Sequence, residues 1–316
     1  LKGYTKQEIS WMMYDWANSA HSVIIVTLLP IFFDTVAGYT ADSVSSMSTW
    51  GFATSLAMAI VALSAPFLGV FGDIRGMRKK LFSFFMLLGV AACAGMAFTP
   101  GMDFTSGPVA AGKVASLILV LYIVSVIGFD ASAIYYDAFL TDVTTEDRMD
   151  KVSTMGYGLG YIGGSTIPLL IFLIMNLIGV PMLTCLAFVF GLTAVWWLAF
   201  SLPLLKNCEQ TSGKPYEKGD VARSIKGVGT TIKEIIANKP MLIYILSYFF
   251  YIDGVHTVIS MATTYGTNLG LDSTGMMLAL LLVQILGLPF CLLYIKCSEK
   301  FGARTMVGFG ICVYMF

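Results

Sequence analysis

The chain has 316 residues, of which 57% are hydrophobic and 12% are charged, whereas soluble domains average about 25% charged residues. This composition excludes a disordered chain, a disulfide-stapled secreted scaffold and an ordinary cytosolic enzyme, and it indicates a membrane protein with several spans. The 19 basic residues balance the 19 acidic residues, so the chain lacks the overall basic field that nucleic-acid binding requires.

Apolar stretches of about 20 residues are long enough to cross roughly 30 Å of hydrocarbon. Eight such stretches follow one another, and a ninth begins near Met306. We therefore predict an all-α polytopic membrane protein. The chain begins at Leu1 and stops inside the ninth stretch, so we expect a piece of a longer protein whose first span is retained rather than cleaved as a signal. The predicted spans are residues 11–33, 48–71, 81–98, 114–140, 152–177, 180–205, 241–265 and 276–295.

Basic residues test this count of spans. If the loops are numbered alternately, every Lys and Arg except Lys113 falls on the side that carries the N-terminus. Positively charged loops stay in the cytoplasm, so we expect a cytoplasmic N-terminus. The predicted location is the cell membrane, or the vacuolar membrane if the protein is eukaryotic.

A polar stretch separates the first six spans from the remainder. We predict an N-terminal six-helix bundle over 1–205, a cytoplasmic linker over 206–239 and the start of a C-terminal bundle over 240–316. Residues 224–237 could form a short surface helix in this otherwise solvated linker. The string NSAHSVI at 18–24 is echoed by DGVHTVI at 253–259, which favours a duplicated six-helix unit.

Ionisable side chains lie inside the predicted spans, although none of them is Lys or Arg. An ionised acid at the centre of a membrane helix costs roughly 2.5–3.5 kcal/mol, so such residues usually face protein or a wet cavity and mark functional sites. Counting residues places four of them near the middle of spans one, four and seven. They are His21, Asp130, Asp253 and His256.

Two further acids lie nearer the ends of their spans. Asp15 and Asp137 are about one and a half turns from the side that carries the N-terminus, given about 3.6 residues per turn. Asn18 is three residues beyond Asp15, so the two share a helix face, with His21 adjoining it. Asp130 and Asp137 are seven residues apart and also share a face.

We interpret these residues as a site for a small polar solute and coupled protons. The groups could instead only satisfy one another's hydrogen bonds between helices, or the two His and two Asp could bind a divalent cation in a metal transporter. Zinc ligands are normally closely spaced, and only Asp253 and His256 are, so we expect no metal site and no cofactor. The predicted binding residues are Asn18, His21, Asp130, Asp253 and His256, with Asp15 and Asp137 as a second polar layer.

A glycine-rich charged loop follows the second span. Its pattern G-x3-D-x2-G-x-R-K resembles the signature loop of the major facilitator superfamily. The strings YDWANSA at 14–20 and YDAFL at 136–140 resemble the vacuole-effluxer-like branch, whose eukaryotic members are autophagy-related amino-acid effluxers. The residues of the signature pattern are Gly69, Asp73, Gly76, Arg78 and Lys79.

The resemblance implies the superfamily fold of two six-helix bundles, here with eight spans and part of a ninth. It further implies a secondary transporter that works by alternating access, with spans one, four and seven lining the central cavity and the signature loop bracing one half against the other. We expect Glu146, Asp147, Arg148 and Asp150 to pair with that loop. The implied solute is an amino acid moved in the efflux direction, with proton coupling.

Other classes of function stay open at this point. A non-transporting receptor or scaffold on the same fold has the same pattern of spans. We predict that the protein is not an enzyme, since the chain contains no phosphate-binding G-x4-G-K-[ST] loop, no HExxH motif and no nucleophile paired with a base. The expected partners are a small-molecule substrate and the lipid bilayer.

Overall fold

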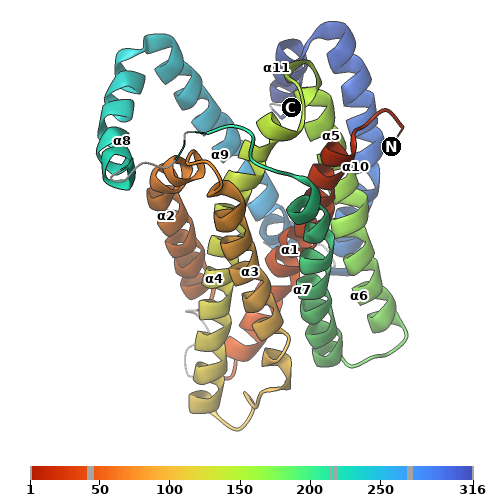
Figure 1. The fold of residues 1–316 in the computed structure, drawn as a ribbon. Coiled ribbons are helices and arrows are strands. Elements are labelled where there is room, and N and C mark those ends of the chain that lie inside the picture. The colour runs from red at the N-terminus through yellow and green to blue at the C-terminus, as the bar shows by residue number, and fades with distance from the viewer. Residues whose placement is uncertain (1, 41–45, 214, 216–219, 269–272, 315–316) are drawn as a thin grey trace. The chain divides into compact units, whose positions relative to one another are not determined.

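The structure is a computed structural model that describes residues 2–40, 46–213, 215, 220–268 and 273–314. Within these ranges helices are the regular elements and no strand occurs, so the prediction of an all-α protein is confirmed (Figure 1). Seven of the described helices are long and apolar enough to cross a membrane, and one bent pair of helices passes the same test when taken together.

The chain divides into two compact units, Leu1–Tyr216 and Glu217–Phe316. The second unit begins with a strongly amphipathic helix, α8, at the position where the sequence predicts a surface helix. Its helices are α8 Asp220–Ala237, α9 Lys239–Asn268, α10 Ser273–Phe301 and α11 Ala303–Tyr314.

The first unit contains all six predicted spans of the N-terminal half. Each span lies inside a helix or extends beyond it by at most two residues, except that the fifth is interrupted by a six-residue π-helical segment, η4. The helices are α1 Lys6–Ala37, α2 Ser46–Gly72, α3 Arg78–Met96, α4 Pro108–Val143, α5 Met149–Gly160, η4 Tyr161–Thr166, α6 Ile167–Leu177 and α7 Met182–Asn207, with short 3-10 turns η2 Thr99–Gly101 and η3 Glu146–Arg148.

The π-helical turn has a local cause. Pro168 lacks an N–H and cannot donate to the preceding turn, so the regular hydrogen-bond ladder is broken there. The hydroxyl of Thr166 donates instead to the carbonyl oxygen of Tyr161, five residues back, at 2.7 Å. The span remains continuous but has a widened turn where it passes α1.

Helix α1 runs through the middle of the first unit and contacts α4, α5, η4 and α7 (Figure 1). It begins with a capping box, in which the Thr5 side chain accepts from the Glu8 N–H and the Glu8 carboxylate accepts from the Thr5 N–H. Buried residues lie all around this helix, because neighbours cover it on most sides. The polar residues Asp15, Asn18 and His21 of α1 are therefore buried against other helices.

Glycines set the separation of α3 and α4. A Cβ added to Gly128 would lie 2.5 Å from the backbone nitrogen and 2.7 Å from the Cα of Gly89. The six-membered ring of Trp197, from α7, lies against the same Gly89. Two backbones and one indole ring thus meet at a point that has no room for a methyl group.

Candidate functional site

His21 lies at the middle of α1, enclosed between α4 and α7. Its side chain is 2% exposed, its Nε2 is 3.3 Å from the Ser125 hydroxyl, and its ring stacks on Phe129 with centroids 4.7 Å apart. The indole ring of Trp197 is 5.2 Å from the imidazole. The Nδ1 atom has no hydrogen-bond partner within the described part of the chain. Asn18, one turn earlier, is buried at 8% exposure.

Asp15 is also buried, at 8% exposure, where α1 meets α4 and α5. The Tyr136 hydroxyl donates to Asp15 Oδ2 at 2.7 Å. The indole N–H of Trp11 donates to the Tyr136 carbonyl at 2.9 Å, and the two rings stack with centroids 4.3 Å apart. Gly156 of α5 packs against the same carboxylate, and a Cβ added there would lie 2.4 Å from Asp15 Oδ2. Sequence spacing predicted the shared face of Asp15 and Asn18 but not the tyrosine donor.

The variant Tyr136→Phe tests the hydrogen bond to Asp15. It keeps the ring stack on Trp11 but removes the hydroxyl, which leaves the buried carboxyl group without this donor. We expect the free energy of unfolding to fall by about 1–3 kcal/mol, measured as a lower thermal midpoint in detergent. Tyr39→Phe, at an exposed tyrosine, is the control; equal midpoints for the two variants would contradict the assignment.

The two acids of α4, Asp130 and Asp137, are less enclosed than Asp15. Asp130 is half-buried and Asp137 is exposed on the surface of the first unit. Neither carboxylate receives a hydrogen bond or an ion pair from any residue that the structure describes. Asp15, in contrast, accepts a hydrogen bond from Tyr136.

The remaining predicted site residues belong to the second unit. Asp253 is an exposed residue of α9. The side chain of His256 lies outside the described residues. Within the first unit, His21 stacks on Phe129, the residue that precedes Asp130, and Asn18 lies about one turn before His21 on α1.

The signature loop joins α2 to α3. The backbone of Gly76 has φ +81°, a conformation that residues other than glycine rarely adopt, so the turn requires a glycine there. The Asp73 N–H donates to the Gly69 carbonyl at 3.2 Å and closes the last turn of α2. Asp73 Oδ1 lies 3.9 Å from the guanidinium of Arg78. The carboxylate of Asp73 is itself largely exposed.

Arg78 is buried at 5% exposure, and its partners come from distant parts of the chain. Its guanidinium forms an ion pair with Asp142, donates to the Ala138 carbonyl at 3.0 Å and lies over the Phe139 ring. Lys79 Nζ donates to the Cys208 carbonyl at 3.1 Å. Asp142 was not among the predicted residues, although it lies about one and a half turns beyond Asp137 at the same end of α4.

The expected pairing of Arg148 with the signature loop is wrong. Arg148 forms a two-pronged ion pair with Glu8, with Nε to Oε1 at 2.8 Å and Nη2 to Oε2 at 2.9 Å. The Thr144 hydroxyl donates to Glu8 Oε1 at 2.7 Å. The reason is that α1 begins beside the turn between α4 and α5, so the nearest unpaired carboxylate is Glu8 rather than one in the loop after α2.

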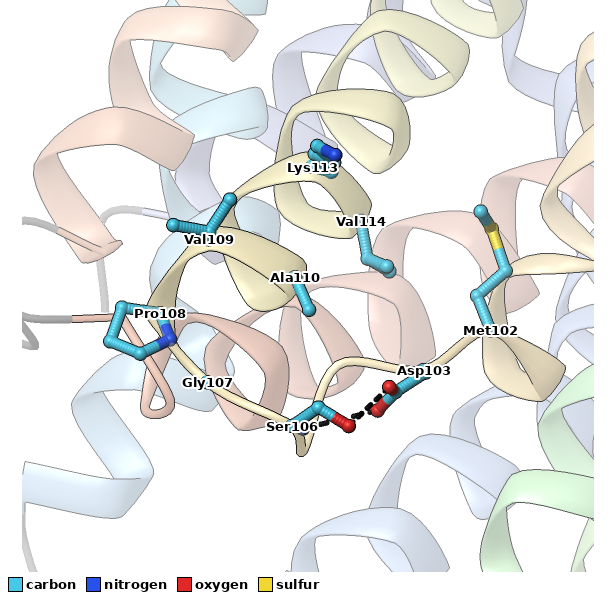
Figure 2. A pocket seen from close by; sticks show the side chains of 9 residues that line it. All are labelled: Met102, Asp103, Ser106, Gly107, Pro108, Val109, Ala110, Lys113 and Val114. Carbon is cyan, nitrogen blue, oxygen red and sulfur yellow. Dashed lines mark hydrogen bonds between the residues drawn. The ribbon is translucent and has the colours of Figure 1, made fainter.

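An open, mostly apolar hollow lies at the opposite end of the first unit, around the turn between η2 and α4 (Figure 2). Asp103 organises this turn: its side chain accepts from the Ser106 hydroxyl and from the N–H groups of Ser106 and Thr105. These hydrogen bonds, that from the Ser106 side chain first, hold the pKa of the Asp103 carboxyl below its ordinary value. None of the predicted site residues lines the hollow, so we do not place the solute site there.

A metal centre needs several ligands near one point. Among the described residues there is no group of three His, Cys, Asp or Glu side chains that could hold a metal ion. Cys208 is buried beside the signature loop, and this burial raises the pKa of its thiol to about 12, so the thiol stays protonated at neutral pH.

Comparison with known proteins decides the family. The model of the family described as vacuole effluxer Atg22-like matches residues 4–316. The chain belongs to this family. An uncharacterised MFS-type transporter of Bacillus subtilis strain 168, YxiO, is 39% identical over the whole chain, which covers 73% of that relative. The autophagy-related protein 22-1 of Penicillium rubens is 24% identical over 177 residues, 52% of this chain and 30% of that protein.

Membership of the Atg22-like family confirms the resemblance that the sequence motifs indicated. The protein is a multi-pass integral membrane protein of an MFS-type transporter family, and not an enzyme. A transporter of this class acts on a small-molecule substrate within the membrane.

Proposed function

We propose that this Atg22-like protein is a secondary active transporter that moves a small polar solute by alternating access, with proton coupling. Amino acids moved in the efflux direction are the first solute class to test. We further propose that residues 1–205 and the bundle that starts at 240 are the two halves of the carrier, joined by a linker over 206–239. The N-terminus would face the cytoplasm, as the distribution of basic residues favours.

The observation that carries the proposal is the environment of Asp130. This acid lies at membrane depth on a helix of a transporter family, yet none of the described residues supplies it with a hydrogen bond or a cation. Leaving such a group without compensation costs several kcal/mol, so acids of this kind are usually tied to a solute or ion path. A proton or an ammonium group of the solute would supply the missing positive charge.

We propose roles for the other polar residues on the same basis. Asn18, His21 and Asp130 of the first unit, with Asp253 and His256 of the second, are the proposed solute- and proton-binding residues. Asp15 and Asp137 form a second polar layer, supported by the buried hydrogen bond from Tyr136 to Asp15.

Counterflow in proteoliposomes tests the proposal. The full-length protein, reconstituted and loaded with a panel of unlabelled amino acids, is expected to accumulate the matching radiolabelled amino acid. Asp130→Asn and Asp253→Asn should each lower this exchange by about tenfold or more, because each removes a charge-assisted contact with the solute or proton. The pH dependence of exchange should flatten in the same variants.

Asp103→Asn is the matched control for these variants. Asp103 is a carboxylate outside the spans, and asparagine can still accept the hydrogen bonds of its turn. This variant should exchange solute as the wild type does. Unchanged exchange with unchanged pH dependence in Asp130→Asn would overturn the assigned site, and a wild-type protein that exchanges no solute would favour a receptor or scaffold.

A further inference from the structure

The segment that follows α7 does not leave the first unit at once. Residues 208–213, which we name the strap, run along the signature loop and the end of α4. These residues fall in the first part of the predicted linker over 206–239. Their hydrogen bonds attach them to the packed structure around Arg78.

Gln210 is the centre of the strap. Its Oε1 accepts from the Gly76 N–H at 2.8 Å and from the Arg78 N–H at 3.2 Å, and its Nε2 donates to the Gly72 carbonyl at 2.9 Å. One side chain therefore satisfies three backbone groups of the signature loop, two at the α3 side and one at the α2 side.

These backbone groups need an outside partner. The first N–H groups and the last C=O groups of a helix have no partner within that helix. Gly72 ends α2, and Arg78 begins α3 after Met77, whose side chain makes no capping hydrogen bond. Gln210, far away in the chain, does what a local capping residue does in other helices.

Asp142 binds the strap through a second set of hydrogen bonds, beside those of Gln210. Its Oδ1 accepts from the N–H and hydroxyl groups of Thr211, at 3.1 and 2.9 Å, and from those of Ser212, at 2.9 and 2.8 Å. Its Oδ2 is paired with Arg78. One carboxylate thus holds the strap and the signature arginine together, and Gly213, with φ +112°, passes close to the Asp73 carbonyl.

We propose that Gln210 is a positioning residue for the signature loop, and that the strap holds this loop in the position seen here. The loop between α2 and α3 then moves only when the strap is released. The hydrogen bonds of Gln210 and Asp142 support the positioning of the loop by the strap, whereas the effect of this positioning on transport rests on the proposed alternating-access function.

Hydrogen–deuterium exchange of the full-length protein tests the positioning role without any solute. In Gln210→Ala, peptides that contain Gly76 and Arg78 should exchange about tenfold faster, because their N–H groups lose the Oε1 acceptor. Gln210→Glu keeps an acceptor oxygen and should preserve most of the protection at these amides. Glu209→Ala, at the exposed neighbouring residue, should change neither.

Two exchange results would overturn the inference. One is unchanged exchange of the signature-loop peptides in Gln210→Ala. The other is an equal rise across all helices of the first unit, which indicates a general loss of stability rather than a local role. Asp142→Asn, which weakens the other attachment, should speed exchange at Thr211 and Ser212 and so checks the strap independently.

Counterflow then tests the consequence for transport. With a solute that the wild type exchanges, Gln210→Ala should change the maximal rate of exchange at least twofold while KM stays the same, because the loop does not contact the solute. An unchanged maximal rate would overturn the transport role. If the wild type exchanges no solute, the proposed function fails, whereas the hydrogen-exchange result still decides whether Gln210 positions the loop.

Discussion

Alanine at position 128 is expected to lower the free energy of unfolding of the first unit by about 3 kcal/mol, at the upper end of the cost of overpacking. The added methyl group would lie 2.7 Å from the carbonyl oxygen of Phe85 and equally close to the backbone of Gly89. Backbone atoms cannot rotate away, so α3 and α4 must separate along their length. Thermal unfolding of the purified protein in detergent, followed by circular dichroism, measures the effect.

Gly112→Ala is the matched control for this prediction. Gly112 lies on the same helix, but nothing is found within 4 Å of an added Cβ. Alanine is also the better helix former by about 1 kcal/mol, so this control should be neutral or slightly stabilising. Equal unfolding midpoints for Gly128→Ala and Gly112→Ala would show that α3 and α4 do not pack at this distance.

The second large effect concerns Arg148 and Glu8. Removal of Arg148 by alanine leaves the Glu8 carboxylate, whose side chain is 2% exposed, without its only cation among the described residues. Breaking a buried ion pair costs roughly 3–5 kcal/mol. Because the Arg148 side chain is itself 33% exposed, solvent screens the pair and we expect a smaller loss, measured as a lower unfolding midpoint.

A double-mutant cycle measures this interaction. Glu8→Ala and Arg148→Ala should each lower the unfolding midpoint, and the double variant should lose less than the sum of the two. Lys80→Ala removes an exposed cation at the same end of the first unit and should have little effect. Strict additivity of the two single variants would exclude a direct contribution of the ion pair.

Several features followed from local sequence alone. The helices of the first unit lie where apolar stretches of membrane length were counted, because hydropathy and helix length are properties of single segments. The turn at Gly76 and the shared face of Asp15 and Asn18 were also predictable, since a positive φ and a helical period depend on a few neighbouring residues. The interruption of span five at η4 was not predicted, although Pro168 was visible in the sequence.

Glu8 and Asp142 illustrate what local patterns do not contain. Both stand near span ends, where a charged residue can always be read as solvated. In the structure both acidic side chains are buried and paired with an arginine. Asp142 pairs with Arg78, 64 residues away in the chain, and Glu8 pairs with Arg148, 140 residues away. No periodicity within either segment records such a partner, because the pairing arises only when α1, α3, α4 and the strap come together.

By itself, the sequence determined the all-α membrane class, the order of the spans, the signature loop and the resemblance to the vacuole effluxers. All of these depend on segments of a few to about 20 residues. The tertiary structure alone decided that Arg148 pairs with Glu8, that Tyr136 donates to Asp15 and that Gln210 caps the signature loop. Hydrogen bonds and ion pairs act only over a few ångströms, so distant residues become partners only when helix packing brings them within reach.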